Sequence, residues 1–413
     1  MSGRFAFQVL KRDPGTGARR GRMTTQHGEV ETPAFMPVGT AGTVKAMTPQ
    51  DLATLGFELI LGNAYHLALR PGEDLVRRLG GLHRFMGWEG SILTDSGGFQ
   101  VLSLADRCAI SDDGVAFRSH LDGSLLTMTP ERSLSIQDAL GSDIVMAFDD
   151  CPPLPSGLER LLEAVRRTTL WARRSRDAFP GNGRAQFGII QGGDDRELRE
   201  RSVEEITALG FEGYAIGGVS VGESAERSRS IVALTAPRLP EDQPRYLMGM
   251  GTPSDLVEMV ALGCDLFDCV LPTRNARNGT LFTTTGRLQI KRREFADDPR
   301  PVDEACGCPV CRGFSRAYLR HLYAAGEILS MCLNTLHNLH HYADLMRRAR
   351  AAIEAGRYAE FLTKFRARAA EAEASAADGD KAPGRDVPAR PGAHRGARGT
   401  RGRSGSIAGE KIE

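Results

Sequence analysis

Eight short apolar runs recur along the chain, and most are followed by a Gly-rich or polar loop and then a helical pattern. They fall at residues 34–37, 59–61, 92–94, 144–147, 187–190, 213–216, 246–248 and 266–269. Most contain too few polar residues to alternate, as expected of parallel strands buried on both faces. Helical periodicity separates several of them, at residues 131–139, 157–178, 196–209, 224–235 and 254–262. This order predicts an α/β fold of the (β/α)8, or TIM-barrel, type, with a doubly wound sheet as the competing architecture.

Segments outside this pattern predict additions to the barrel. Residues 5–10 and 22–25, joined by a Pro/Gly turn at 13–17, indicate a small N-terminal antiparallel sheet. Residues 116–118 and 120–122 indicate a β-hairpin inserted between the third and fourth strands. Residues 294–337 carry a cysteine cluster, which suggests an inserted metal-binding subdomain, and residues 339–374 then resume a helical period. We therefore expect one catalytic domain over residues 1–374.

Composition and charge restrict the remaining possibilities. Beyond residue 375 the chain is dominated by Gly, Arg, Pro, Ala and Ser, so residues 375–413 are expected to form a disordered Arg/Gly-rich tail. The chain holds 53 Lys+Arg and 52 Asp+Glu, so a nucleic-acid surface has to come from local clustering of charge. No run approaches the ~18 apolar residues needed to span a bilayer, and no apolar signal-peptide core is present. These features predict a cytoplasmic protein with no membrane partner.

Carboxylates, an amide and paired glycines follow the predicted strands at their carboxyl ends, where barrels carry active sites. The loops concerned are residues 95–100, 149–152, 191–193, 217–223, 249–253 and 268–274. A single Asp after a strand is usually a helix N-cap, and a single Gly-Gly is usually a turn. Because at least five loops of one rim carry such residues together, the pattern favours a functional site.

The residue types on this rim favour chemistry at a glycosidic bond. No loop has the G-x-G-x-x-G spacing or a P-loop Lys, and no Ser-His or Cys-His nucleophile pattern is evident. Two carboxylates can divide glycosidic chemistry, one attacking the anomeric carbon while the other handles the proton. Asp and Gln together match the donor and acceptor edge of a purine, and Gly-Gly pairs let a flat ligand approach the backbone. The residues alone allow glycosyl transfer or hydrolysis and do not identify the sugar.

A cysteine cluster near the C-terminal end of the barrel indicates a metal site. Three thiols within six positions and one later imidazole compose it: Cys306, Cys308, Cys311 and His337. This closed Cys3His set suits a structural Zn²⁺ ion, with His340 and His341 as rivals for the fourth position. The other cysteines are scattered among apolar neighbours and are expected to be reduced.

A basic run adjoins both the last strand and the metal subdomain. It comprises Arg274, Arg277, Lys291, Arg292 and Arg293, extended by Arg300, Arg312, Arg316 and Arg320. Such clusters are usually solvated faces. Beside the proposed pocket, however, they could position a polymeric substrate through phosphate contacts.

With these motifs in view, the chain closely resembles the bacterial-type tRNA-guanine transglycosylases, from about residue 5 to residue 365. The likeness rests on residues 95–100, 191–193, 217–218 and 268–277 and on the Cys-x-Cys-x2-Cys…His set, all in family order. It implies a (β/α)8 barrel with a zinc-bearing insertion, one structural Zn²⁺ per subunit and a homodimer. It further implies exchange of the wobble guanine, position 34, of GUN-anticodon tRNAs (Asp, Asn, His and Tyr) for 7-aminomethyl-7-deazaguanine, in queuosine biosynthesis.

The resemblance also implies roles for individual residues. Asp268 would be the nucleophile that attacks ribose C1′ and forms a covalent enzyme–RNA intermediate, and Asp95 would be the proton acceptor for the incoming base. The implied base-binding residues are Asp95, Ser96, Gly97, Gly98, Phe99, Asp149, Gln191, Gly218, Val219, Glu223 and Met248. The implied RNA-binding residues are Gly249, Met250, Gly251, Thr252, Pro253, Ser254, Asp255, Thr273, Arg274, Asn275, Ala276 and Arg277.

Two residues depart from the pattern of the bacterial members. Asp150 stands where many members carry Glu, and Ser220 stands where Ala is usual. We expect the shorter carboxylate at position 150 to be tolerated.

Three other functions fit the sequence less well. An archaeal-type enzyme would need further RNA-binding domains, and a noncatalytic RNA-binding subunit would not need both Asp95 and Asp268. A carbohydrate hydrolase would favour a sugar-stacking Trp array, but the only tryptophans, Trp88 and Trp171, lie outside the rim loops.

Overall fold

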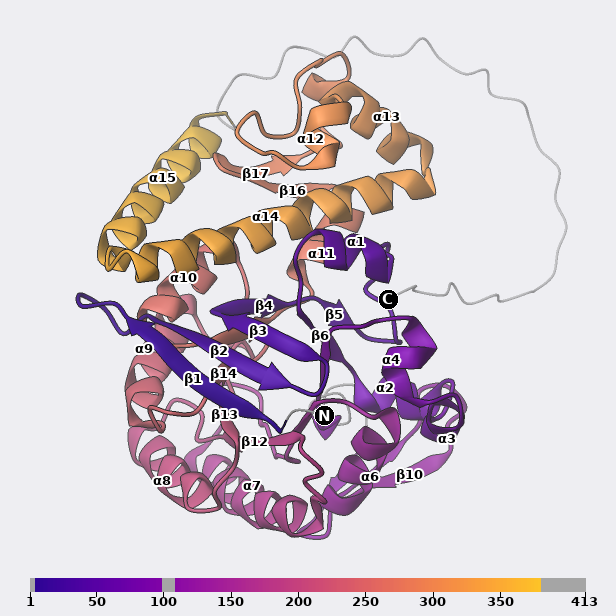
Figure 1. Ribbon diagram of the computed structural model, residues 1–413, viewed down its shortest axis with the longest axis vertical. Coiled ribbons are helices and arrows are strands. Elements are labelled where there is room, and N and C mark those ends of the chain that lie inside the picture. Colours follow the sequence, from indigo (N-terminus) through magenta and orange to yellow (C-terminus); the bar gives the residue numbers. More distant parts are fainter. Residues whose placement is uncertain (1–3, 99–107, 380–413) are drawn as a thin grey trace, which may run out of the picture. The chain divides into compact units, whose positions relative to one another are not determined.

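A parallel barrel forms the centre of the computed structural model, which describes residues 4–98 and 108–379 (Figure 1). Its nine strands are ordered β4 (Ala34–Met36), β15 (Leu266–Asp268), β14 (Arg245–Leu247), β13 (Gly213–Ile216), β12 (Ala185–Ile190), β11 (Ile144–Met146), β7 (Ser91–Thr94), β6 (Leu59–Gly62) and β5 (Val38–Gly39). Only Pro37 separates β4 from β5, so the two ends of the sheet belong to one stretch of chain. When β4 and β5 are counted together, the eight predicted runs supply the eight strand positions of the barrel, here called staves. The predicted barrel is confirmed.

Alternate residues of each stave enter two different cores. In β6, Leu59 and Leu61 belong to the cluster inside the barrel, whereas Ile60 packs in the cluster beneath the surrounding helices. This is the two-residue period of a strand applied to a surface that is buried on both sides. It explains why the runs carry no polar alternation.

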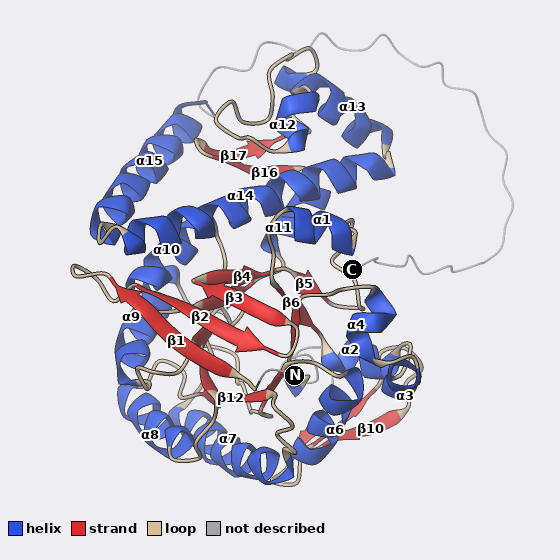
Figure 2. Cartoon of the chain, viewed as in Figure 1, coloured by secondary structure: helices blue, strands red, loops and turns tan. Residues whose placement is uncertain are grey.

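Helices surround the strands, as Figure 2 shows by the blue ribbons around the red centre. The predicted ones are present as α6 (Pro130–Leu140), α7 (Leu158–Ala178), α8 (Arg196–Thr207), α9 (Ala225–Thr235) and α10 (Pro253–Ala261). Four of the five begin at a Ser, Thr or Asp whose side chain accepts a backbone N–H of the first turn: Thr129, Asp195, Ser224 and Thr252.

Four short helices after the first two staves were not predicted. They are α1 (Pro49–Thr54), α2 (Ala64–Leu69), α3 (Glu73–Arg78) and α4 (Gly81–Met86), each of six residues. Helices this short span fewer than two turns, so they give little periodicity to detect.

A three-stranded antiparallel sheet covers the N-terminal end of the barrel. It consists of β1 (Ala6–Arg12), β2 (Arg19–Thr25) and β3 (Gly28–Thr32). Met23 and Val30 join the cluster inside the barrel, and the Thr25 hydroxyl lies 2.8 Å from that of Ser91 at the start of β7. The predicted N-terminal sheet is confirmed, with a third strand in addition.

The insertion after the third stave contains β8 (Ala109–Ile110), β9 (Val115–Arg118) and β10 (Leu125–Met128), which pair as an antiparallel sheet. The predicted second strand at residues 120–122 is wrong. These residues lie in the turn, which is closed by hydrogen bonds of 2.9 Å from Ser119 N–H to the Ser124 carbonyl and from Gly123 N–H to the Ser119 carbonyl. The Gly123 φ of +74° suits a turn and not a strand.

After β15 the chain forms α11 (Leu271–Arg277), the hairpin β16 (Thr280–Thr283) and β17 (Gly286–Gln289), then α12 (Pro309–Gly313) and α13 (Arg316–Ala325). The helical period predicted for residues 339–374 is divided between α14 (Ile328–Glu354) and α15 (Tyr358–Gly379). Gly356, with φ +63°, lies between them. Residues 375–379 of the predicted tail belong to α15. The remaining residues of that tail, 380–413, lie outside the described residues. Among the helices that the structure describes, none is long and apolar enough to cross a membrane.

Candidate active site

Three aspartates lie at the carboxyl ends of barrel strands. Asp95 follows β7, Asp149 follows β11, and Asp268 is the last residue of β15. Polar contacts connect the loops that carry them. The Ser96 hydroxyl lies 3.5 Å from Asp149 Oδ1, and the negative charges of both Asp268 and Asp95 act on buried Tyr246.

Asp268 is held through a single oxygen. The Tyr246 hydroxyl donates to Oδ1 at 2.6 Å, and the Gly249 N–H donates to the same atom at 2.8 Å. No described residue donates to Oδ2, which leaves that oxygen for a reacting carbon. Burial raises the pKa of Asp268, while the two donors act in the opposite direction by favouring the anion.

Asp95 is held by the loop of the neighbouring strand. The Asn63 side-chain amide donates to Oδ2, and the Ala64 N–H at the start of α2 donates to Oδ1 at 2.8 Å. Asn63 was not predicted as a site residue. The available signal was its place two residues after the 59–61 run, because it is the first polar residue after β6 (Leu59–Gly62).

Asp149 and Gln191 form a buried pair. The Gln191 Nε2 group donates to Asp149 Oδ2 at 2.7 Å. Burial raises the pKa of Asp149 to about 7, and the nearby charge of Asp150 adds to this effect. The Gln191 Oε1 atom is also buried and has no partner among the described residues. A buried acceptor without a partner is costly, so this atom indicates a missing ligand donor.

Two glycines opposite Gln191 leave no room for side chains. A Cβ at Gly217 would lie 2.7 Å from Gln191 Nε2, and one at Gly218 would lie 2.6 Å from Gln191 Oε1. Gly218 also has a φ of +63°, a backbone conformation that residues with a Cβ atom rarely adopt. The backbone itself therefore forms this wall of the pocket. On the Asp149 side, a Cβ at Gly98 would meet the Asp149 carbonyl oxygen at 3.0 Å.

The other predicted base-binding residues differ in what the structure reveals. Phe99 lies outside the described residues. Val219 is buried, and Met248 packs against the cluster inside the barrel. Glu223 faces its own loop, where it accepts from Ser220 N–H at 2.5 Å, from Val221 N–H at 3.0 Å and from the Ser228 hydroxyl. Burial works to raise the pKa of Glu223, but these hydrogen bonds outweigh it and lower the pKa.

Both predicted RNA-binding stretches are attached to α14. The Tyr342 hydroxyl donates to the Gly251 carbonyl at 2.6 Å, within the 249–255 stretch. The Asn338 amide donates to the Pro272 carbonyl at 2.9 Å, next to the 273–277 stretch on α11. In that stretch, Arg277 Nη1 is buried and has no partner among the described residues. It is an available donor for an anionic group.

The cysteine cluster comes together as expected. The Nδ1 atom of His337 lies 3.9, 3.5 and 3.4 Å from the sulfurs of Cys306, Cys308 and Cys311. The opposite nitrogen of His337 lies 2.8 Å from the Phe282 carbonyl, which accepts its N–H and leaves Nδ1 as the ligand atom. This buried set could hold a metal ion. Of the two rivals, His340 approaches only Cys306, at 3.6 Å, and His341 stacks on the Phe282 ring.

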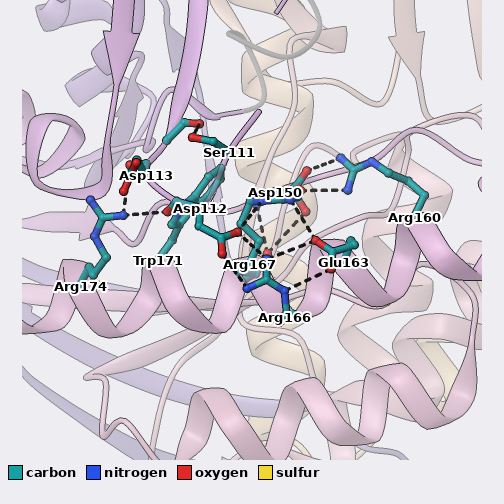
Figure 3. A network of polar contacts seen from close by, with 12 residues as sticks. Ser111, Asp112, Asp113, Asp150, Arg160, Glu163, Arg166, Arg167, Trp171 and Arg174 are labelled. Carbon is teal, nitrogen blue, oxygen red and sulfur yellow. Dashed lines mark hydrogen bonds and ion pairs between the residues drawn. The ribbon is translucent and has the colours of Figure 1, made fainter. Parts of the chain in front are cut away.

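The side chain of Asp150 binds α7. Its carboxylate accepts from Arg160 Nη1 at 2.9 Å and from Arg167 Nη1 at 2.6 Å (Figure 3). The same network continues through Glu163 and Arg166 to Asp112. The shorter carboxylate at this position is therefore fully engaged by arginines.

Comparison with known proteins finds relatives that all carry the same name. A family model described as Queuine tRNA-ribosyltransferase matches residues 13–371. A queuine tRNA-ribosyltransferase of Cereibacter sphaeroides is 54% identical over 374 residues, covering 90% of this chain and 99% of that protein. Proteins of the same name from Moorella thermoacetica and Azoarcus sp. are 57% and 56% identical, each covering 87% of this chain and 96% or 97% of their own length. The resemblance and the prediction of a pentosyltransferase enzyme are confirmed, and the chain belongs to the queuine tRNA-ribosyltransferase family.

Proposed function

We propose that this enzyme exchanges guanine 34 of GUN-anticodon tRNAs for 7-aminomethyl-7-deazaguanine through a covalent enzyme–RNA intermediate. The observation that carries the proposal is the arrangement of two kinds of carboxylate at one rim. Asp268 is fixed through one oxygen and leaves the other available, whereas Asp149 and Gln191 form a buried pair suited to a purine edge. Membership of the family supports the same reaction.

In the first half of the reaction, Asp268 attacks ribose C1′ as the bond from C1′ to guanine N9 breaks. The electron pair of that bond goes to N9, which takes a proton from the carboxyl group of Asp95. In the second half, Asp95 accepts the N9 proton of the incoming base, whose N9 attacks C1′ and displaces Asp268. Two displacements at one carbon retain its configuration, and the same group serves as acid and base.

Base recognition follows from donors and acceptors. An ionised Asp149 accepts N–H groups of the guanine edge, the Gly218 backbone faces the same edge, and the Gln191 amide completes the set. Phe99 and Met248 would sandwich the base, while Val219 and Glu223 lie on the loop that would meet the aminomethyl group. A base has to leave its stack to enter such a pocket, which suits an exposed anticodon loop.

The RNA backbone would be held by the stretches 249–255 and 273–277, which α14 supports. Arg277 carries the strongest argument, because a phosphate would satisfy its buried donor. The remaining assembly is proposed from the resemblance: a cytoplasmic homodimer with one catalytic domain over residues 1–374.

The donor set of the cysteine cluster fits Zn²⁺. Cys306, Cys308, Cys311 and His337 are four soft or borderline ligands with no open position, so the ion would stabilise the fold and take no part in the reaction. One of the four ligands, His337, lies on α14, the helix that also contacts the predicted RNA-binding stretches. His337 adjoins Asn338, whose amide donates to the Pro272 carbonyl in the first turn of α11, the helix that follows Asp268.

The test is incorporation of radiolabelled guanine into unmodified tRNA-Tyr. The wild type should incorporate label and form a covalent RNA adduct, and Asp268→Asn should do neither. Asp138→Asn, on the outer helix α6, is the matched control and should retain both activities. An active Asp268→Asn variant would refute the nucleophile assignment, and no incorporation by the wild type would refute the exchange reaction.

A further inference from the structure

A fully buried arginine lies behind the glycine wall of the pocket. Arg199 of α8 donates from Nε to the Gly193 carbonyl at 2.7 Å and from Nη1 to the Ile190 carbonyl at 3.0 Å. It also donates from Nη1 to the Gly217 carbonyl at 2.8 Å and from Nη2 to the Gly218 carbonyl at 3.3 Å. All four acceptors are main-chain carbonyls at the carboxyl ends of β12 and β13.

These contacts fix two peptide planes beside Gln191. In a planar trans peptide the C=O and N–H groups point in opposite directions. Because Arg199 holds the Gly217 carbonyl, the Gly218 N–H of the same peptide points away from the guanidinium. Likewise, because Arg199 also donates to the Gly218 carbonyl, the Val219 N–H of that peptide points away from Arg199.

A second observation locates the Gly218 N–H. Burial raises the pKa of the Cys151 thiol to about 12, against hydrogen bonds from the Gln191 side chain and the Gly218 backbone that lower it. This effect agrees with the direction set by Arg199, in which the Gly218 N–H points to the side of Cys151 and the recognition amide. Sulfur is a weak acceptor, so a carbonyl oxygen of a ligand would bind this N–H better.

We infer that Arg199 is a positioning residue which orients the Gly218 N–H and thereby selects incoming bases that carry a carbonyl at the 6-position. The inference rests on the proposed function, in which the Gly218 backbone faces the purine edge. A planar guanidinium is suited to the task, because its fork reaches several fixed acceptors at once. A cation bound to the peptide carbonyl also polarises the peptide and strengthens its N–H as a donor.

The neighbouring glycines make this arrangement depend on Arg199. Gly218 has no side chain to hold its conformation, and a Cβ there would lie 3.0 Å from Arg199 Nη2. Glycine peptides are free to rotate in the absence of a partner. Without the guanidinium, the Gly217–Gly218 peptide could turn its carbonyl toward the pocket, where it would repel a 6-oxo group.

The experiment compares competing bases in the guanine-incorporation assay. The 6-oxo group is present in guanine and hypoxanthine, and 2,6-diaminopurine carries an amino group in its place. In Arg199→Met, the KM for guanine and the inhibition constant for hypoxanthine should rise roughly tenfold or more. The inhibition constant for 2,6-diaminopurine should change much less, so discrimination falls. The KM for tRNA should stay within about twofold, because phosphate contacts lie elsewhere.

Arg245 provides the matched control. It is a buried arginine that donates to the Leu239 carbonyl at 3.0 Å, but at the start of β14 and so at the opposite end of the barrel. Arg245→Lys should preserve the ratio of guanine to 2,6-diaminopurine binding. Arg199→Lys, which keeps the charge but not the planar fork, should give an intermediate ratio.

The outcomes separate the two proposals. If the wild type and Arg245→Lys exchange guanine but a folded Arg199→Met keeps the wild-type ratio, the role of Arg199 is refuted and the exchange reaction stands. If the wild type exchanges no base, the proposed function fails first. Should Arg199→Met not fold, Arg199→Gln replaces it. If every Arg199 variant unfolds while Arg245→Lys folds, Arg199 is needed for folding and the inferred positioning role is refuted.

Discussion

The hydroxyl oxygen of Tyr246 lies 2.6 Å from Oδ1 of Asp268, at the rim where β14 and β15 end. Tyr246 itself is buried inside the barrel, and burial raises its pKa well above the usual value, with the charge of Asp268 adding to the shift. The phenol thus stays protonated and donates. A barrel strand that is otherwise apolar therefore supplies a donor that favours the ionised form of a buried carboxylate.

Removing this donor should slow the reaction. In Tyr246→Phe, Asp268 loses a hydrogen bond to its charged form, worth about 1.5–3 kcal/mol, so its already raised pKa rises further. We expect kcat to fall roughly tenfold or more and the acidic limb of its pH profile to move to higher pH. Tyr214→Phe, whose hydroxyl donates to the Thr207 carbonyl away from the pocket, is the control. An unchanged pH profile in Tyr246→Phe would contradict this role.

Base binding should depend on the ionisation of Asp149. The pKa of this carboxyl is raised to about 7 by burial, so below that pH it is protonated and loses one acceptor for the guanine edge. The KM for guanine should therefore rise as the pH falls through about 7. In Asp149→Asn it should be high at every pH. A wild-type KM that is flat between pH 6 and 8 would count against the assignment.

The same shift has a consequence for stability, measured by thermal unfolding. A carboxyl whose folded pKa lies above its unfolded value of about 3.9 destabilises the fold as the pH rises from that value toward 7. Asp149→Asn should consequently unfold at a higher temperature than the wild type at pH 8. The two proteins should converge near pH 4, and a variant that is less stable at pH 8 would contradict the sign.

Loss of one cysteine ligand should remove the metal. Cys308 is fully buried, and its sulfur also accepts the Cys311 N–H at 3.3 Å at the start of α12. In Cys308→Ala, zinc content should fall to near zero by elemental analysis, and the unfolding temperature should fall with it, since structural zinc contributes directly to folding. Cys332→Ala, a cysteine of α14 outside the cluster, should keep its zinc. Full occupancy in Cys308→Ala would refute the ligand set.

The sequence predicted those features that repeat or that concentrate chemistry. The staves were recognisable because β6 and its neighbours are apolar on both faces, and the cluster ending at Cys311 was recognisable from its spacing alone. Asn63 and Tyr246 were not predicted. Each becomes a site residue through one hydrogen bond to an aspartate of a neighbouring strand, at a separation of 32 and 22 residues. The hydrophobic periodicity of a sequence does not indicate which distant polar side chains will form such hydrogen bonds.

Arg199 illustrates the same difficulty in a helix. In the sequence it belongs to the polar pattern of 196–209, where an arginine predicts a solvated face. Only the closure of the barrel brings its guanidinium to the carbonyls that follow β12 and β13. The fold is therefore visible in the sequence pattern, whereas the residues that support the aspartates are defined only by contacts between distant segments.

A carboxylate at the opposite end of the barrel should govern stability at low pH. Asp143, just before β11, accepts from His27 Nδ1 at 2.7 Å, from His83 Nε2 at 3.2 Å and from Ile92 N–H at 2.9 Å. It thereby attaches the turn between β2 and β3 to the barrel. Burial acts to raise the pKa of Asp143, but the His83 and His27 hydrogen bonds outweigh it, so the pKa is lowered.

A lowered carboxyl pKa contributes stability above the unfolded value of about 3.9, and that contribution is lost as the pH falls below it. Asp143→Asn should therefore cost roughly 2 kcal/mol in the free energy of unfolding at pH 7, and the difference from the wild type should shrink below about pH 4. Denaturant unfolding at both pH values measures this difference. Asp51→Asn, whose carboxylate accepts the Thr48 N–H in the capping box of α1, is the control, with a small effect that stays local to its helix. A penalty in Asp143→Asn that persists undiminished in acid would mean that packing, and not the charge, holds the turn in place.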